Sequence, residues 1–345
     1  MKAPPTSSGQ VLYLSNLDEP KPLVRENVLS TIGDTPLVRL KKLFPDPGPQ
    51  VFAKLEAFNP GGSIKDRPAL YILEESLRAG LLNQNSVIIE SSSGNMGIGL
   101  AQACRYHGLR FICVVDPKAS TQNLKILRAY GAEIDFVAEP DRETGEFLPA
   151  RLKRVRTLLQ QVEGSFWPNQ YENTNNPRAH YRTTMYEIVT ALNGRLDYLF
   201  VGTSTCGTIR GCAEYVRDHG LLTQVVAVDA VGSLIFSDIP EKRLLPGLGA
   251  GLKPRLCDPA LIDRYVHVSD LECVVGCRRL VMREAFLAGG SSGGVISAME
   301  RLRPELPPQA VCALILPDRG ERYLDTVYDD AWVREHFGNI FNAWG

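Results

Sequence analysis

Short runs of β-branched and other apolar residues alternate along this chain with segments of helical periodicity, and this alternation constrains the fold more than any other feature. Strands are expected at 87–90, 110–115, 134–137, 198–201, 225–229 and 311–316. Helices are expected at 97–107, 121–130 with Ser120 as N-cap, 148–162, 208–219 and 270–287. The alternation predicts an α/β protein with two doubly wound parallel-sheet domains, in which ligands bind at the carboxyl ends of strands.

One lysine and three loops of small residues lie at places where such sheets bind ligands. Lys65 follows Gly61-Gly62-Ser63 and precedes a helix expected near Pro68, and the loops are 90–97, 202–208 and 289–294. Taken singly, a lysine is usually a solvated surface charge and such a loop is often only a helix cap. Together they supply the amine, the anion-binding N–H groups and the polar contacts that a pyridoxal phosphate (PLP) enzyme requires.

Each segment has a role that its residue types favour. Lys65 is expected at the amino-terminal edge of a helix, where the local potential favours the neutral amine. The loop 91–97 is suited to a substrate carboxylate and Asn95 to a cofactor hydroxyl, whereas 202–208 is suited to a phosphate. The loop 202–208 matches neither a P-loop nor a dinucleotide fingerprint. A hydroxyl such as Ser291 is a weak partner for a ring nitrogen and favours β-elimination over transamination.

Composition excludes several other classes of function. The 345 residues are enough for two domains, and a net charge of −1 gives no reason to expect nucleic acid or membrane as a partner. Eight cysteines without a Cys-x-x-Cys pair are typical of reduced thiols in a cytoplasmic protein. The five histidines lack metal-ligand spacing, so no metal is assigned. Residues 1–22 are expected to form a flexible extension without the apolar segment of a secretory signal.

The ordered segments resemble the cysteine synthase/cystathionine β-synthase family of fold-type II PLP enzymes, whose architecture is that of the tryptophan synthase β subunit. The matching segments run through most of the chain: Ile32–Val38, Lys54–Glu56, Asn59–Arg67, Ser92–Gly99, Asn169–Asn173, Ser204–Thr208, Leu248–Gly251, Ser291–Gly293 and Gly320–Leu324.

This resemblance implies specific roles for the matched residues. Lys65 would be the Schiff-base and catalytic lysine, Asn95 the partner of the ring hydroxyl, and Ser291 the partner of the ring nitrogen. The phosphate would be held by Ser204, Thr205, Cys206, Gly207 and Thr208. The substrate carboxylate would be bound by Ser92, Ser93, Gly94, Asn95 and Gln170. The resemblance also implies a homodimer, with a smaller mobile domain at 58–168 and a larger PLP-binding domain formed by 23–57 and 169–345.

Departures from the family pattern indicate the second substrate. Ser204 stands where ordinary cysteine synthases have Gly, and Tyr171 where they have Phe. These features resemble the branch that makes N-(2-amino-2-carboxyethyl)-L-glutamate from O-phospho-L-serine and L-glutamate, a step toward 2,3-diaminopropionate for siderophores or antibiotics. Ser204 and Tyr171 are therefore predicted to form the glutamate pocket. Candidates for a cation that binds the substrate phosphate are Lys118, Arg210, Lys242 and Arg243.

Three other functions stay open from the sequence. One is a cysteine synthase that uses an activated serine and sulfide, and another is a β-replacement enzyme that condenses serine with homocysteine. The third, from a different class, is a catalytically silent binding partner within a synthase complex, which the intact lysine and loops disfavour.

Overall fold

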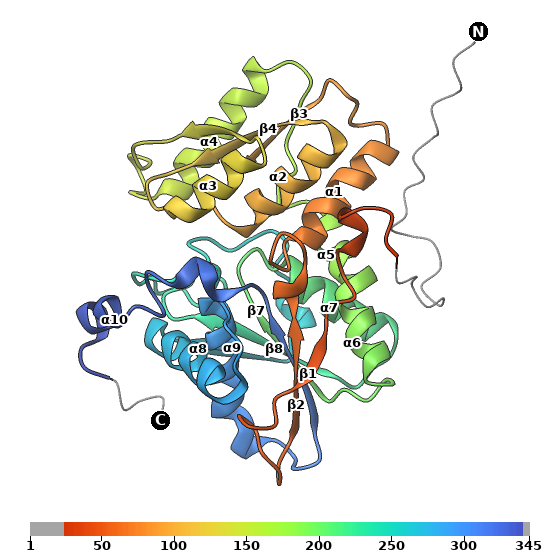
Figure 1. Ribbon diagram of the computed structural model, residues 1–345, viewed down its shortest axis with the longest axis vertical. Helices are drawn as coiled ribbons and strands as arrows, with labels where there is room; N and C mark the ends of the chain where they lie inside the picture. The colour runs from red at the N-terminus through yellow and green to blue at the C-terminus, as the bar shows by residue number, and fades with distance from the viewer. Residues whose placement is uncertain (1–23, 341–345) are drawn as a thin grey trace.

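The computed structural model describes residues 24–340 and has two α/β lobes, each built on its own sheet (Figure 1). The predicted flexible extension, 1–22, lies outside the described residues. No helix in 24–340 is long and apolar enough to cross a membrane. Nor does this part of the chain contain a group of three or more His, Cys, Asp or Glu side chains placed to hold a metal ion.

The smaller sheet has four parallel strands in the order β5-β4-β3-β6. These are β3 (Val87–Ser91), β4 (Arg110–Val115), β5 (Glu133–Phe136) and β6 (Ser165–Phe166). Apolar side chains of α1 (Asp66–Arg78), α2 (Asn95–His107) and α3 (Thr121–Ala129) form the core on one face. On the other face α4 (Phe147–Gln161) packs through Val155 and Leu158. Leu29 and Ile32 join the first of these cores, although they precede the stretch predicted as the smaller domain.

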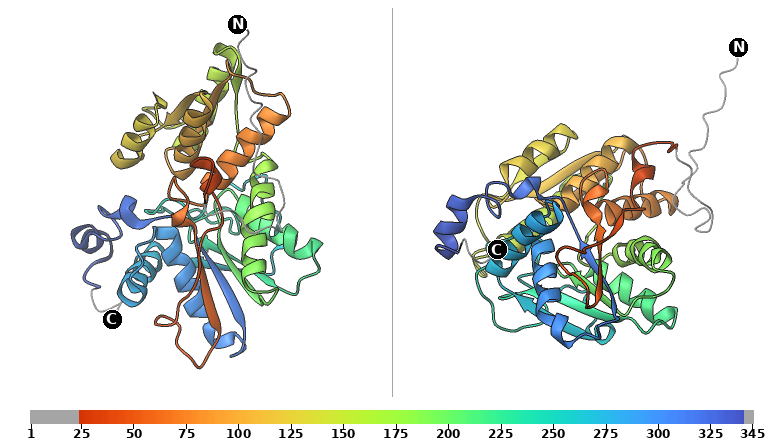
Figure 2. Two further views of the ribbon diagram at one scale, coloured as in Figure 1. Left: turned by 45° about the vertical axis from the view of Figure 1, so that its right-hand side comes forward. Right: turned by 60° about the horizontal axis from the view of Figure 1, so that its bottom comes forward.

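The larger sheet has six strands in the order β1-β2-β10-β7-β8-β9, parallel except for β1. These strands are β1 (Leu37–Arg39), β2 (Gln50–Leu55), β7 (Tyr198–Gly202), β8 (Gln224–Ala230), β9 (Arg264–Val268) and β10 (Val311–Leu316). Two helices, α8 (Asp270–Glu284) and α9 (Gly290–Leu302), cover one face. The opposite face is covered by α6 (Tyr186–Ala191), α7 (Gly207–Asp218) and the π-helical turn His180–Met185 that follows α5 (Asn175–Ala179). The last helix within residues 24–340 is α10 (Asp330–Phe337), which lies beside α8 (Figure 2).

The predicted doubly wound α/β fold is confirmed, with local differences that have physical causes. Ser120 caps α3 as predicted, since its hydroxyl accepts from the Asn123 N–H at 3.2 Å. The helix predicted at 270–287 ends at Glu284, because Ala285 takes a left-handed φ of 55°. The helix expected near Pro68 begins at Asp66, so the proline lies within its first turn, where no N–H is needed.

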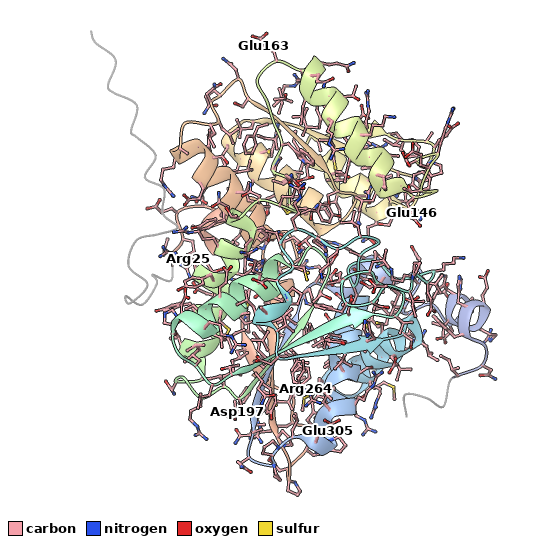
Figure 3. All side chains as sticks on the ribbon, turned by 180° about the vertical axis from the view of Figure 1, so that it is seen from behind. Arg25, Glu146, Glu163, Asp197, Arg264 and Glu305 are labelled. Carbon is pink, nitrogen blue, oxygen red and sulfur yellow. The ribbon has the colours of Figure 1, made fainter. Side chains whose placement is uncertain are left out.

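The two lobes occupy opposite ends of the molecule. In Figure 3 the label of Glu163 lies beyond the smaller sheet, and Arg264 and Glu305 mark the far end of the larger one. Those two side chains form an ion pair of 2.6 Å that joins β9 to the turn after α9. The segments that connect the lobes therefore cross the middle of the molecule, where the predicted loops also meet.

Candidate active site

A cavity of about 270 Å³ lies between the lobes, at the carboxyl ends of β3, β7 and β10. This is the edge at which parallel sheets bind ligands. The structure brings almost all the sequence-predicted site residues together here, although their segments are up to about 226 residues apart along the chain. The cavity is lined by Lys65, Ser92, Ser93, Gly94, Asn95, Gln170, Tyr171, Ser204, Thr205, Cys206, Thr208 and Ser291.

Four helices begin at this cavity without a side-chain cap. They are α1, α2, α7 and α9, and the side chain of the N-cap residue accepts no hydrogen bond in any of them. Two neighbouring hydroxyls do accept, Ser63 from the Lys65 N–H and Ser92 from the Gly97 N–H. Helices α3, α8 and α10 are capped by Ser120, Ser269 and Asp329, whereas α4, α5 and α6, whose first residues do not line the cavity, also lack such a cap. Uncapped first turns carry N–H groups without intrahelical partners and a positive potential. The first turns of α2 and α7, whose residues line the cavity, are therefore suited to bind anionic groups.

Lys65 is the N-cap residue of α1 and its backbone is held by the larger lobe. The Ile64 N–H donates to the Pro317 carbonyl at 2.7 Å, and Ser63 pairs with Asp318 in an isolated β-bridge. Burial lowers the pKa of the Lys65 amine to about 8, although the nearby Cys206 and Asp318 oppose this shift. A substantial neutral fraction near pH 8 makes this amine a competent nucleophile and base.

The loop before α7 forms a cradle supported from behind by other side chains. The Thr208 hydroxyl contacts Nε2 of the buried His180 at 3.2 Å, and His180 Nδ1 contacts the Thr184 hydroxyl at 3.0 Å. Burial, together with the charges of Lys65 and Arg67, holds the pKa of His180 well below its usual range, so the ring is neutral. Cys206 adopts a left-handed φ of 63°, which turns the chain into the helix.

Gly207, the one predicted cradle residue that does not line the cavity, is required for a different reason. A Cβ at this position would lie 2.1 Å from Asn176 Oδ1. Asn176 in turn donates to the Gln170 carbonyl at 2.7 Å and contacts the Thr205 hydroxyl at 3.5 Å. The absent side chain thus lets Asn176 tie the cradle to the Gln170 segment.

Asn95 connects the two lobes. Its amide nitrogen donates to Asp318 Oδ2 at 2.8 Å, and its oxygen accepts from Arg322, which also donates to the Gly61 carbonyl. Asp318 accepts a second bond from Tyr323 at 2.8 Å, and burial raises the pKa of its carboxyl. The Asn95 amide keeps a second N–H and a second lone pair for a cofactor hydroxyl, and that role remains a prediction.

A positively charged side chain, Arg151, lines the cavity together with Gln170 and Tyr171. Arg151, in α4, lines the cavity, and its Nε lies 3.1 Å from Oδ2 of the buried Asp116. None of the four candidate cations from the sequence lines the cavity. Lys118 is exposed and pairs with Glu146 at 3.8 Å, Arg210 pairs with Glu214 at 2.7 Å, and Arg243 donates to the Leu248 carbonyl.

Sequence reasoning missed two charged residues that line the cavity, Arg151 and Asp318. Arg151 belongs to a basic stretch of α4 that also carries Lys153, Arg154 and Arg156, so its sequence context is that of a solvated helix face. For Asp318 a signal existed, because it follows directly after the strand predicted at 311–316, at the edge where ligands bind.

These groups fit pyridoxal phosphate. Lys65 offers an amine for its aldehyde, and the uncapped first turn of α7 with Ser204, Thr205 and Thr208 suits its phosphate. Ser291, which is buried at the start of α9, offers a hydroxyl for its ring nitrogen. The first turn of α2 is left for a carboxylate.

Comparison with known proteins gives a consistent result. The family model described as "Pyridoxal-phosphate dependent enzyme" matches residues 28–318. Three solved structures share 32% sequence identity with this chain. The match to a hydrogen sulfide-producing enzyme from Fusobacterium nucleatum covers 87% of this chain and 100% of the chain of that enzyme, with a TM-score of 0.81.

The other two structures extend the comparison. An O-ureido-L-serine synthase covers 90% of this chain and 99% of its own, with a TM-score of 0.82. The match to an O-acetylserine-dependent cystathionine β-synthase from Helicobacter pylori covers 88% of this chain and 98% of the chain of that enzyme, with a TM-score of 0.81. The names of these three enzymes indicate different products, although all three share the same sequence identity with this chain.

Proposed function

Because this chain belongs to the pyridoxal-phosphate dependent enzyme family and is of its β-replacement class, we propose that it joins O-phospho-L-serine to L-glutamate. The products would be N-(2-amino-2-carboxyethyl)-L-glutamate and phosphate, in a step toward 2,3-diaminopropionate. The observation that carries this proposal is the wall formed by Arg151, Tyr171 and Ser204 in the same cavity as Lys65. A cation and two hydroxyls suit a substrate with an additional negative charge.

The reaction needs one group that moves a proton at Cα, and Lys65 is suited to that task. When bound, pyridoxal phosphate supplies the electron sink that makes this proton acidic. The Lys65 amine, with a pKa of about 8, is the base for the Cα proton and returns it after the new bond has formed. Ser92 and Ser93, with the uncapped first turn of α2, hold the α-carboxylate of the substrate.

The wall would bind two anions in succession. Arg151 keeps N–H donors besides the Nε that faces Asp116, so its guanidinium can contact the phosphate of the first substrate. Once the phosphate has left, the same donors can contact the side-chain carboxylate of glutamate. The Ser204 and Tyr171 hydroxyls would orient that carboxylate, and the glutamate amine would then face the β carbon.

A matrix of substrates tests the proposal. The holoenzyme is incubated with O-phospho-L-serine or O-acetyl-L-serine, each combined with glutamate, homocysteine or sulfide, and the products are identified by mass. We expect the phosphoserine and glutamate pair to give the largest kcat/KM. Cysteine as the preferred product would refute the proposal in favour of a cysteine synthase.

A variant tests the residue that carries the argument. Arg151→Met should lower kcat/KM for glutamate by about 10- to 100-fold, because a charge-assisted hydrogen bond contributes about 1.5–3 kcal/mol. Arg210→Met, which removes an arginine outside the cavity, is the matched control and should leave this ratio within about twofold. Equal losses in both variants would contradict the assignment.

A further inference from the structure

Glu90 is a buried carboxylate directly behind the substrate wall. It is 0% exposed at the end of β3 and does not line the cavity, but the next residue, Ser91, does. Its Oε1 accepts from the Ser91 N–H at 2.8 Å and from the indole N–H of Trp167 at 3.1 Å. Its Oε2 accepts from the Gln170 N–H at 3.2 Å. Glu90 thus joins β3 to the segment that leads into Tyr171.

All three partners of Glu90 are hydrogen-bond donors. A carboxylate satisfies them because the ionised form only accepts, whereas a protonated carboxyl directs one O–H toward a donor. Burial raises the pKa of Glu90 to about 7, although the bonds from Trp167, Ser91 and Gln170 oppose the shift. The charged and titratable groups around it are Arg151, which favours the ionised form, and Cys113 and Tyr171, whose own pKa values Glu90 raises.

We propose that Glu90 is a positioning residue, whose ionised carboxylate holds the Gln170–Tyr171 turn against the end of β3 and so sets the affinity of the cavity for its amino-acid substrates. The three N–H contacts carry this inference. A second contact reinforces it, since the Gln170 side-chain amide donates to the Ser91 carbonyl at 3.4 Å. The proposal rests on the proposed function only for the identity of those substrates.

The spectroscopic test observes the Trp167 indole N–H directly. In the holoenzyme, the ¹H–¹⁵N signal of this group, assigned by its loss in Trp167→Phe, should shift between pH 6 and 8 with a midpoint near 7. In Glu90→Gln the shift should be absent. Trp332, which stacks on His336 with ring centroids 4.4 Å apart, serves as an internal control and should respond to pH equally in both proteins. A Trp167 signal that titrates unchanged in Glu90→Gln overturns the proposal.

The kinetic test separates positioning from a general loss of structure. Glu90→Gln places an amide N–H₂ against a donor, so KM for the amino-acid substrates should rise roughly tenfold or more while kcat falls less. The matched control is Glu74→Gln, because burial also raises the pKa of Glu74 to about 7 but this residue lies on α1 and outside the cavity. Its KM values should stay within about twofold of the wild type. A KM unchanged in folded Glu90→Gln, or a fall in kcat alone, overturns the proposal.

Two features keep this inference independent of other outcomes. If Glu90→Gln does not fold, Glu90→Asp replaces it in the test, because the aspartate keeps an acceptor-only group one methylene further from Gln170. This variant should raise KM to a smaller extent. An unchanged KM in Glu90→Asp would again contradict the proposal. The indole titration involves no substrate, so an error in the choice of glutamate would alter the product matrix without altering the titration.

Discussion

Arg67 should be among the side chains that this fold tolerates losing least. Its guanidinium is 0% exposed and bidentate to two carboxylates, with contacts to Glu56 at 2.7 and 2.8 Å and to Glu187 at 2.6 and 2.8 Å. In Arg67→Met the fully buried Glu56 keeps only the Thr35 hydroxyl and the Asn59 amide as side-chain partners. Glu187 retains Lys54 at 2.6 Å. The substitution therefore leaves one buried carboxylate without a cation.

The magnitude follows from that arrangement. Removal of one partner of a buried ion pair costs about 3–5 kcal/mol, because the remaining charge is desolvated without compensation. This loss is a large part of the roughly 5–15 kcal/mol by which native domains are stable. Burial would raise the pKa of Glu187, but Arg67 and Lys54 outweigh it and hold the pKa at about 2, below the ordinary 4.5. The contribution of ionised Glu187 to the free energy of unfolding is therefore complete above pH 4.5 and is lost as pH falls toward 2.

The assay is urea unfolding of Arg67→Met at pH 7, with Arg110→Met as the control. Arg110 also makes a bidentate pair, with both contacts to Glu133 at 3.0 Å, but its side chain and that of Glu133 are 59% and 52% exposed. The exposed pair should contribute less than about 1 kcal/mol. If the two variants differ by less than about 1 kcal/mol in unfolding free energy, the argument from burial is refuted.

Three further outcomes follow from the site and the backbone. Lys65→Ala should abolish turnover and the visible absorption band of the Schiff base between lysine and pyridoxal phosphate, whereas Lys118→Ala, which alters an exposed lysine, should retain both; a Lys65→Ala protein that keeps this band would contradict the assignment. The rate at which apoenzyme takes up pyridoxal phosphate should rise about tenfold from pH 7 to 9 and then level off, since the neutral fraction of an amine with pKa of about 8 does so; a rate that keeps climbing above pH 9 would indicate an unshifted lysine. Ala285→Gly should stabilise the protein by about 0.5–1 kcal/mol in thermal unfolding, because φ at this exposed helix end is 55°; a loss of stability there would count against the reasoning.

The site was predictable where the chemistry resides in local segments. The segments 59–67, 91–97, 202–208 and 289–294 precede or open helices, and each of the four contributes residues to the cavity wall. Arg151 was not predictable in this way, because one arginine among the basic residues of α4 differs from the others only in its partner Asp116, 35 positions earlier in the chain. The strands β1, β2, β6 and β9 were also not predicted. β1 and β6 have only three and two residues, and β2 pairs with β10, which is distant in the sequence.

The amino-acid sequence by itself determined the α/β alternation, the lysine and the small-residue loops, because strand periodicity, glycine conformation and helix N–H groups are local properties of the backbone. The tertiary structure decided which charges act on one another. It paired Arg151 with Asp116, joined Asn95 to Asp318, and placed Glu90 behind Gln170. It also lowered the pKa of Lys65 and raised that of Glu90, since both shifts arise mainly from burial. Desolvation depends on which segments pack around a group, and that packing exists only in the folded chain.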